Sequence, residues 1–263
     1  MLLFGSKRKN PPTKSDAMVF VDYEHWFYSY KNLFNMKPNF AEWLEEIQKE
    51  YETQSVLVFG DFTEREIGYE VAKIEAVGGK VIHSIGTKDG VDKDFTDFIM
   101  LDYMYQAAVV EDSPEVVILF TGDGHFDSVI KYMRDKLHKK VFVYGVKRAF
   151  SGKLKSASSS YVEMPRNIQQ QQYYYQLILE SLNHIGSKPD KYPTYWKTVR
   201  YVSEYNGVSE DRIQTALDEL LDKKYILENE ILPKQGMRTK ILKVCWKKLI
   251  EDGIWKQATA SIN

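Results

Sequence analysis

Acidic side chains close two apolar runs of this chain, each at a point where a strand would end. Asp22 ends the run at residues 17–22, and Asp123 ends the run at 115–123. Short apolar runs that stop at turn residues predict buried strands of a parallel sheet. Ligands of such sheets bind beyond the carboxyl ends of the strands, where the strand order reverses. We therefore expect both carboxylates to face one crevice if these two strands are neighbours.

Two more carboxylates belong to the same pattern. Asp97 lies in the first turn of a helix predicted at 94–110, and Asp127 in the first turn of a helix predicted at 126–139. Several carboxylates in one crevice raise each other's pKa values unless a cation compensates their charge. Hard oxygen ligands suit Mg²⁺ or Mn²⁺, which activate water and stabilise charge on a phosphodiester. The pattern therefore indicates metal-dependent phosphodiester hydrolysis.

Each helical acid also has an ordinary structural interpretation. Asp123 is well placed to cap the helix that follows it, and the helix dipole favours Asp97 and Asp127 in a first turn. Asp94 is the better N-cap of its helix and could also line the crevice in place of Asp97. Asp22 has no helix to cap in this interpretation, so it is the acid that most favours a site.

Strands and helices alternate from residue 17 to residue 164, which predicts βαβ units. The expected fold class is α/β, with a Rossmann-like, mostly parallel sheet between two helical layers. A strand order of 3-2-1-4-5 would place the first and fourth strands side by side. The chain has neither a Gly-rich dinucleotide fingerprint nor a phosphate-loop lysine motif, which disfavours nucleotide cofactors. The predicted strands are 17–22, 55–61, 80–85, 115–123, 140–146 and 161–164, and the predicted helices are 40–51, 65–79, 94–110, 126–139 and a short one at 151–160.

A second domain is predicted after Pro165. Helices are expected at 167–185, 193–207 and 208–226, followed by two strands within 226–246. Three helices and a hairpin are the order of a winged helix-turn-helix. The predicted organisation is a flexible basic arm at 1–16, the α/β domain at 17–166, the winged-helix-like domain at 167–257 and a tail at 258–263.

The net charge of −1 gives no global field for a polyanion, so contacts with nucleic acid must come from local clusters. One basic cluster follows the fifth predicted strand, and another lies on the predicted wing, where cations meet backbone phosphates. The third helix begins with acids, which weighs against strong reading in the major groove. The candidate nucleic-acid ligands are Lys147, Arg148, Lys153, Lys155, Lys234, Arg238 and Lys240.

The cysteine content and the N-terminal sequence exclude several further classes of protein. The single cysteine excludes an internal disulfide framework and a multi-cysteine zinc site. The N-terminal apolar run is too short for a signal peptide or a membrane anchor. We therefore expect a cytoplasmic protein without a membrane partner.

Three blocks of sequence, "FVDYEHW", "GVDKDFTDFIMLD" and "VILFTGDGHFDSVIKYM", resemble the signature blocks of NYN-domain proteins, which are relatives of PIN-like nucleases. The resemblance covers roughly residues 17–164. It implies a Rossmann-like sheet, a cluster of Asp residues that bind Mg²⁺ or Mn²⁺, and ribonuclease activity. The family's metal ligands correspond to Asp22, Asp97 and Asp123. This chain has His25 where the first block often has Asn, and His125 where the third block often has a second Asp.

These observations support three hypotheses. The first is a metal-dependent endoribonuclease that cuts single-stranded RNA at Asp22, Asp97 and Asp123, with Asp127 assisting and the C-terminal domain presenting the RNA. The second, which the two histidines allow, is a catalytically inactive NYN-fold protein that binds nucleic acid or regulates; the winged helix could also bind DNA. The third is an interaction protein whose winged helix recruits a partner. The substrate sequence, the oligomeric state and the pathway stay open.

Overall fold

The computed structural model describes residues 14–84, 95–186, 192–232 and 238–255. The chain divides into two compact units. The longer segment of the first unit ends at Met164, and the longer segment of the second unit begins at Pro165. Four predictions lie outside the described residues: most of the basic arm, Asp94, Lys234 and the C-terminal tail.

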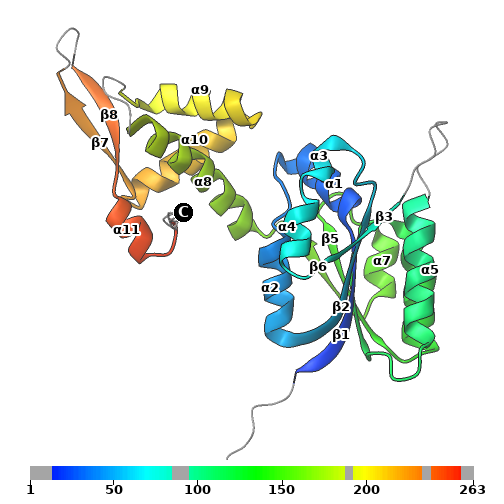
Figure 1. The fold of residues 1–263 in the computed structure, drawn as a ribbon. Helices are drawn as coiled ribbons and strands as arrows, with labels where there is room; N and C mark the ends of the chain where they lie inside the picture. The colour runs from blue at the N-terminus through cyan, green and yellow to red at the C-terminus, as the bar shows by residue number, and fades with distance from the viewer. Residues whose placement is uncertain (1–13, 85–94, 187–191, 233–237, 256–263) are drawn as a thin grey trace, which may run out of the picture. The chain divides into compact units, whose positions relative to one another are not determined.

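The first unit contains a six-stranded sheet in the order β3-β2-β1-β4-β5-β6, and every neighbouring pair of strands is parallel. The α/β class and the predicted order are confirmed, and β6 extends the sheet beyond β5. The strand order reverses between β1 and β4, which therefore lie side by side. Strand β2 lies on the other side of β1 (Figure 1). The strands are β1 Ser15–Asp22, β2 Tyr51–Gly60, β3 Lys80–His83, β4 Val116–Phe120, β5 Lys140–Val146 and β6 Ser160–Met164.

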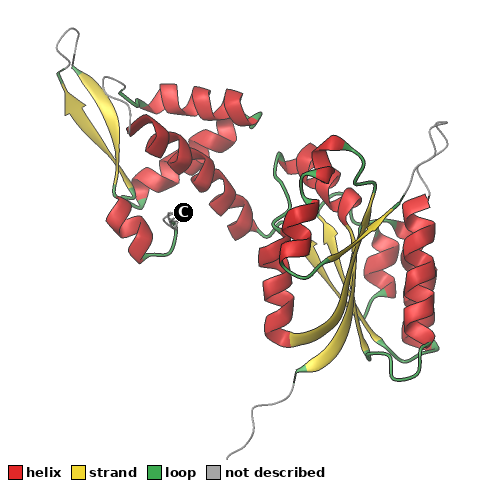
Figure 2. Cartoon of the chain, viewed as in Figure 1, coloured by secondary structure: helices red, strands yellow, loops and turns green. Residues whose placement is uncertain are grey.

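Helices cover both faces of this sheet (Figure 2). The chain pattern explains the two layers, because parallel strands need crossover connections and these connections are helical. On one face lie α1 Tyr23–Phe34, α2 Phe40–Glu50, α3 Arg65–Gly68 and α4 Val71–Ala76. On the other face lie α5 Phe95–Val109, α6 Asp127–Asp135 and α7 Gly152–Ala157.

Strand β4 shows why the sheet is buried on both sides. Its five residues are all buried, and alternate side chains point to opposite faces. Val117 and Leu119 belong to the core that α5, α6 and α7 cover. Phe120 points to the other face, where its ring stacks on Trp26 of α1 with 3.9 Å between centroids. Burial on both faces fixes the end of β4, and the residues that follow it, in place.

Two predictions about the first unit were incomplete. Helix α1 was not predicted, although Tyr23, Trp26 and Phe27 on it are buried. The helix predicted at 65–79 is two short helices, α3 and α4. At Gly68 a side chain would lie 2.9 Å from the carbonyl oxygen of Phe62, so the chain passes too close to the preceding loop for a longer side chain there.

The second unit contains the three helices and the antiparallel hairpin that the sequence predicts, and a short helix α11 that it does not. Its core joins all three long helices through residues such as Leu179, Val199 and Leu217. None of the helices in the described part of the chain is long and apolar enough to cross a membrane. The elements are α8 Asn167–Gly186, α9 Tyr195–Asn206, α10 Glu210–Asp222, β7 Ile226–Ile231, β8 Thr239–Val244 and α11 Trp246–Glu251.

Candidate metal centre

Asp22 is a buried carboxylate fixed by two hydrogen bonds. Pairing of Val21 with Phe120 brings the ends of β1 and β4 together. Thr121 then donates from Oγ1 to Oδ2 of Asp22 at 2.9 Å, and the backbone N–H of His25 donates to Oδ1 at 3.0 Å. Only 4% of Asp22 is exposed. The bond from the N–H of His25 lies in the first turn of α1, so Asp22 caps that helix and the expectation that it has no helix to cap is wrong. A buried carboxylate with partners of this kind is held in one orientation, and each oxygen keeps a second lone pair.

Asp123 caps a short helix and also lies close to Asp97 and His125. It is the N-cap of a short 3-10 helix, Gly124–Phe126, and its Oδ1 accepts from the backbone N–H of His125 at 2.8 Å. Its own N–H donates to Oγ1 of Thr121 at 3.2 Å. One third of its side chain is exposed. The structural interpretation of Asp123 is therefore correct, and it does not exclude a second role for the carboxylate.

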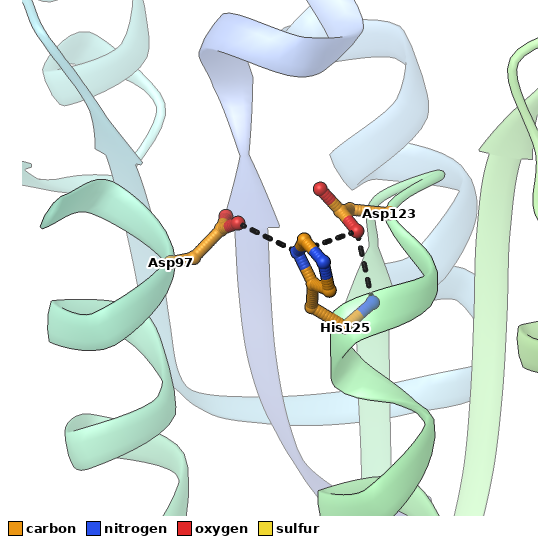
Figure 3. Close-up of side chains that lie close together, drawn as sticks. All are labelled: Asp97, Asp123 and His125. Carbon is orange, nitrogen blue, oxygen red and sulfur yellow. Dashed lines mark hydrogen bonds and ion pairs between the residues drawn. The ribbon is translucent and has the colours of Figure 1, made fainter. Parts of the chain in front are cut away.

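Asp97, Asp123 and His125 form a compact group of ligand atoms, all within 4.8 Å of one another. Nδ1 of His125 lies 3.7 Å from Oδ2 of Asp97 and 3.2 Å from Oδ1 of Asp123. Asp97 comes from the first turn of α5, whereas the other two follow β4, and the imidazole lies between the carboxylates (Figure 3). We call these three residues the acidic cluster. Two carboxylates and an imidazole are a donor set that suits Mn²⁺ and, less well, Mg²⁺.

Burial and mutual repulsion disfavour the charged form of the acids at this centre. Burial, and then the charges of Asp22 and Asp123, raise the pKa of Asp97 to about 7. Burial also raises the pKa of Asp22, although the charge of His25 and hydrogen bonds from His25 and Thr121 oppose the shift. Mutual repulsion of this kind is relieved when a cation binds. The residues present therefore fit a divalent metal.

The structure places the four predicted acids differently from one another. Asp97 and Asp123 share the acidic cluster, and Asp22 acts on Asp97 through its charge without belonging to the same group of ligand atoms. Asp127 is bonded elsewhere: its Oδ2 accepts from Nζ of Lys131 at 2.7 Å, and this partner lowers its pKa. Asp127 is thus part of a surface ion pair on α6.

His25 and Gly122 fix the loop behind the cluster. Nε2 of His25 lies 3.2 Å from the carbonyl oxygen of Ala149, and the N–H of Ser151 donates to the carbonyl of Gly122 at 3.0 Å. A Cβ atom on Gly122 would lie 1.8 Å from the oxygen of Ala149 and 2.3 Å from Nε2 of His25. Only glycine fits at position 122, because the two backbone segments lie so close together there. His25, which stands where the first signature block often has Asn, therefore positions the loop.

Sequence reasoning missed two polar groups near the centre, Thr121 and Glu24. Thr121 is fully buried and bonds both Asp22 and Asp123, yet a threonine after a strand carries no distinctive signal. Glu24 accepts from the N–H of Asp61 at 3.1 Å, and burial followed by the charge of Asp22 raises its pKa. Its place two residues after Asp22, in the first signature block, was the available signal.

The predicted basic residues of the first unit differ in how freely they could contact a phosphate. Lys153 is exposed, and its charge reaches Asp127 beside the cluster. Arg148 is exposed in a left-handed backbone conformation with φ of 70°. Lys155 is committed to Glu163 at 2.7 Å and to two aromatic rings. Lys147 is half-buried. Lys153 and Arg148 are therefore the better candidates for contact with phosphate.

On the hairpin of the second unit, acids of β7 face the cations of β8. Lys240 lies 3.5 Å from a carboxylate oxygen of Glu228, and its register partner is Glu230. Arg238 is exposed beside them. The basic cluster predicted on the wing therefore becomes part of a mixed-charge surface once β7 and β8 pair, and its attraction for a polyanion is weaker than the sequence alone indicates.

Comparison with known proteins defines the class. Residues 16–165 match the NYN domain model, which is more than half of the chain, and the chain therefore belongs to the NYN domain family. Members of this family are generally nucleases of PIN-like fold that use divalent metals, and the domain suggests nucleic-acid binding.

A solved structure has a fold similar to part of this chain. It is a protein of unknown function, VPA0982, from Vibrio parahaemolyticus, with 21% identity and a TM-score of 0.53. The match covers 60% of this chain and 97% of that chain. At this identity the likeness supports the fold alone. No match to this chain was found among curated proteins.

Proposed function

We propose that this protein is a metal-dependent endoribonuclease that cuts single-stranded RNA. The observation that carries the proposal is the acidic cluster, in which Asp97 of α5 and Asp123 after β4 converge with His125 at the carboxyl ends of the strands. The buried charge of Asp22 lies behind them. In an NYN domain, this is the crevice at which a phosphodiester would bind.

The residues of the cluster have distinct roles in this proposal. Asp97, Asp123 and His125 would hold Mn²⁺ or Mg²⁺ together with Asp22, so the sequence-based ligand set gains an imidazole. A bound ion would supply Lewis acidity toward the phosphate and lower the pKa of a water molecule. Thr121 and the N–H of His25 orient Asp22, and the exposed Lys153 attracts the RNA backbone.

Cleavage of labelled single-stranded RNA with Mn²⁺ tests the proposal. We expect Asp22→Asn and Asp123→Asn to reduce the rate by at least about a hundredfold, because each removes a carboxylate from the centre. Asp16→Asn is the matched control, since this exposed acid lies at the opposite end of β1 and bonds Gln54. Full activity of Asp22→Asn and Asp123→Asn would refute the assignment.

We propose that residues 167–257 form a winged-helix-like domain that helps to hold nucleic acid. Three helices followed by a hairpin support it, and Arg238 and Lys240 of the hairpin would contact phosphate. Glu228 and Glu230 lie opposite these cations, so we expect only a modest dependence of binding on salt from this surface. Charge reversal of Arg238 should weaken RNA binding by about threefold or more.

One observation favours a second candidate, an NYN-fold protein that binds RNA without cutting it. Nδ1 of His125 lies within 3.7 Å of both carboxylates, so a protonated imidazole would itself compensate part of their charge. Calorimetric titration with Mn²⁺ at pH 8 separates the two candidates. Binding that Asp123→Asn abolishes favours the nuclease, and the absence of metal binding favours the second candidate.

A further inference from the structure

Helix α5 exposes large apolar side chains along one side. Phe98 is 65% exposed, and Tyr105, seven residues later, is 39% exposed. Residues seven apart in a helix point in nearly the same direction. The ring of Tyr105 contacts that of Tyr132 on α6, with 5.7 Å between centroids. We call Phe98, Tyr105 and Tyr132 the aromatic strip.

The aromatic strip begins at the acidic cluster. Phe98 directly follows Asp97, and α6, which carries Tyr132, begins two residues after His125. Asp97 and His125 face each other at 3.7 Å, so the two helices that bear the strip also bear the two sides of the cluster. Tyr105 lies two turns, about 10 Å, further along α5. A polymer held at the cluster and running along these helices would meet Phe98 first.

The chemistry of the strip matches an unpaired nucleic-acid strand. Contiguous apolar patches on a protein surface mark recognition sites, whereas singly exposed apolar residues are ordinary. Tyr105 and Tyr132 contact each other across α5 and α6, and Phe98 lies on the same side of α5 as Tyr105. Aromatic rings stack with the bases of a single strand, whereas the bases of a duplex present no free faces.

We propose that the aromatic strip, led by Phe98, is a stacking surface for unpaired bases of the RNA strand held at the acidic cluster. The inference rests on the proposed function and adds a structural reason for single-strand selectivity. Phe98 acts as a positioning residue: it fixes the base next to the phosphate at the cluster, and the acids do the chemistry.

Binding of a short fluorescein-labelled oligouridine to the full chain in EDTA tests the role of Phe98 without cleavage. Phe98→Leu keeps the residue apolar but removes the ring, and we expect it to weaken binding about tenfold. Phe98→Tyr should restore binding to within about twofold of the wild type. The matched control is Val109→Ala, because Val109 is equally exposed at 61% on the same helix but cannot stack. A blunt RNA duplex should bind Phe98→Leu and the wild type equally.

Three results would overturn the inference. They are unchanged oligouridine binding by Phe98→Leu, equal loss of single-stranded and duplex binding, and no oligouridine binding by the wild type. Sedimentation velocity adds a fourth: a wild-type dimer that Phe98→Leu dissociates would make the strip an interface between copies. Cleavage by the wild type with Mn²⁺ is measured in parallel, so that failure of the stacking surface is distinguished from failure of the nuclease proposal.

Discussion

Thr121 and Asp22 are joined across two neighbouring strands, with the hydroxyl of Thr121 donating to the Asp22 carboxylate at 2.9 Å. The two residues are 99 positions apart in the sequence, and the bond is buried. It exists because β1 and β4 are adjacent at the reversal of strand order. The same hydroxyl accepts from the N–H of Asp123. One side chain therefore sets the separation of two acids of the centre.

Replacing Thr121 with Val should both weaken metal binding and destabilise the first unit. Val keeps the shape but removes the partner of Oδ2 of Asp22 and of the N–H of Asp123, which costs about 1–3 kcal/mol. Urea unfolding and Mn²⁺ titration measure the two effects. Thr121→Ser retains the hydroxyl and should stay close to the wild type. If Thr121→Val bound Mn²⁺ normally, the hydroxyl would have no role in placing the acids.

Gly122→Ala should disrupt the loop behind the centre. Its new Cβ would overlap the Ala149 carbonyl and the His25 ring, so we expect destabilisation of about 3 kcal/mol or more with loss of metal binding. Gly152→Ala is the matched control, because a Cβ at Gly152 meets nothing within 4 Å and alanine favours a helix. Thermal unfolding measures both variants. Equal melting temperatures would contradict the close approach.

The pKa of Asp97 predicts a pH dependence of stability without metal. Because this pKa is raised from 3.8 to about 7, the unfolded chain loses the Asp97 proton at lower pH than the folded chain. The stability that the proton contributes is present in full below about pH 4 and is lost as the pH rises to 7. Asp97→Asn should therefore gain on the order of 2 kcal/mol over the wild type at pH 8 and little at pH 4. Urea unfolding in EDTA at the two pH values is the measurement. A gain of equal size at both pH values would show that the charge of Asp97 is not its cause.

Replacements of Asp127 and of Asp123 should differ in their effect on cleavage although the two acids are only four positions apart. Asp127 is paired with Lys131, so Asp127→Asn should keep about a third or more of the wild-type rate. Asp123→Asn should be inactive. Rates with Mn²⁺ on the same single-stranded RNA provide the comparison, with circular dichroism to establish that both variants fold. If a folded Asp127→Asn variant were inactive, Asp127 would belong to the catalytic centre, as the sequence pattern predicts.

The arrangement of the sheet was predictable because it depends on patterns that the chain displays. Alternating strands and helices predicted the parallel sheet, and Asp22 and Asp123 at two strand ends predicted that acids gather where the strand order reverses. Helix α1 was missed although its buried Tyr23, Trp26 and Phe27 have helical spacing, because its many aromatic residues also suit strands. Short helices such as α11 offer too few residues for a period to be detected.

The atomic detail of the site was not predictable, because it depends on contacts between distant segments. Asp127 has the same sequence signal as Asp97, an acid in a first helical turn, yet one pairs with Lys131 and the other faces His125. The direction of each side chain follows from how α5 and α6 pack on the sheet. The role of Thr121 likewise depends on a neighbour 99 residues away.

The most direct test of the metal centre is an anomalous difference map from crystals soaked in Mn²⁺. We predict one strong peak within bonding distance of carboxylate oxygens of both Asp97 and Asp123, lost in crystals of Asp123→Asn. His125 should turn its ring nitrogen toward this peak. A map without a peak at the acidic cluster, from crystals of a protein that cleaves RNA, would contradict the account.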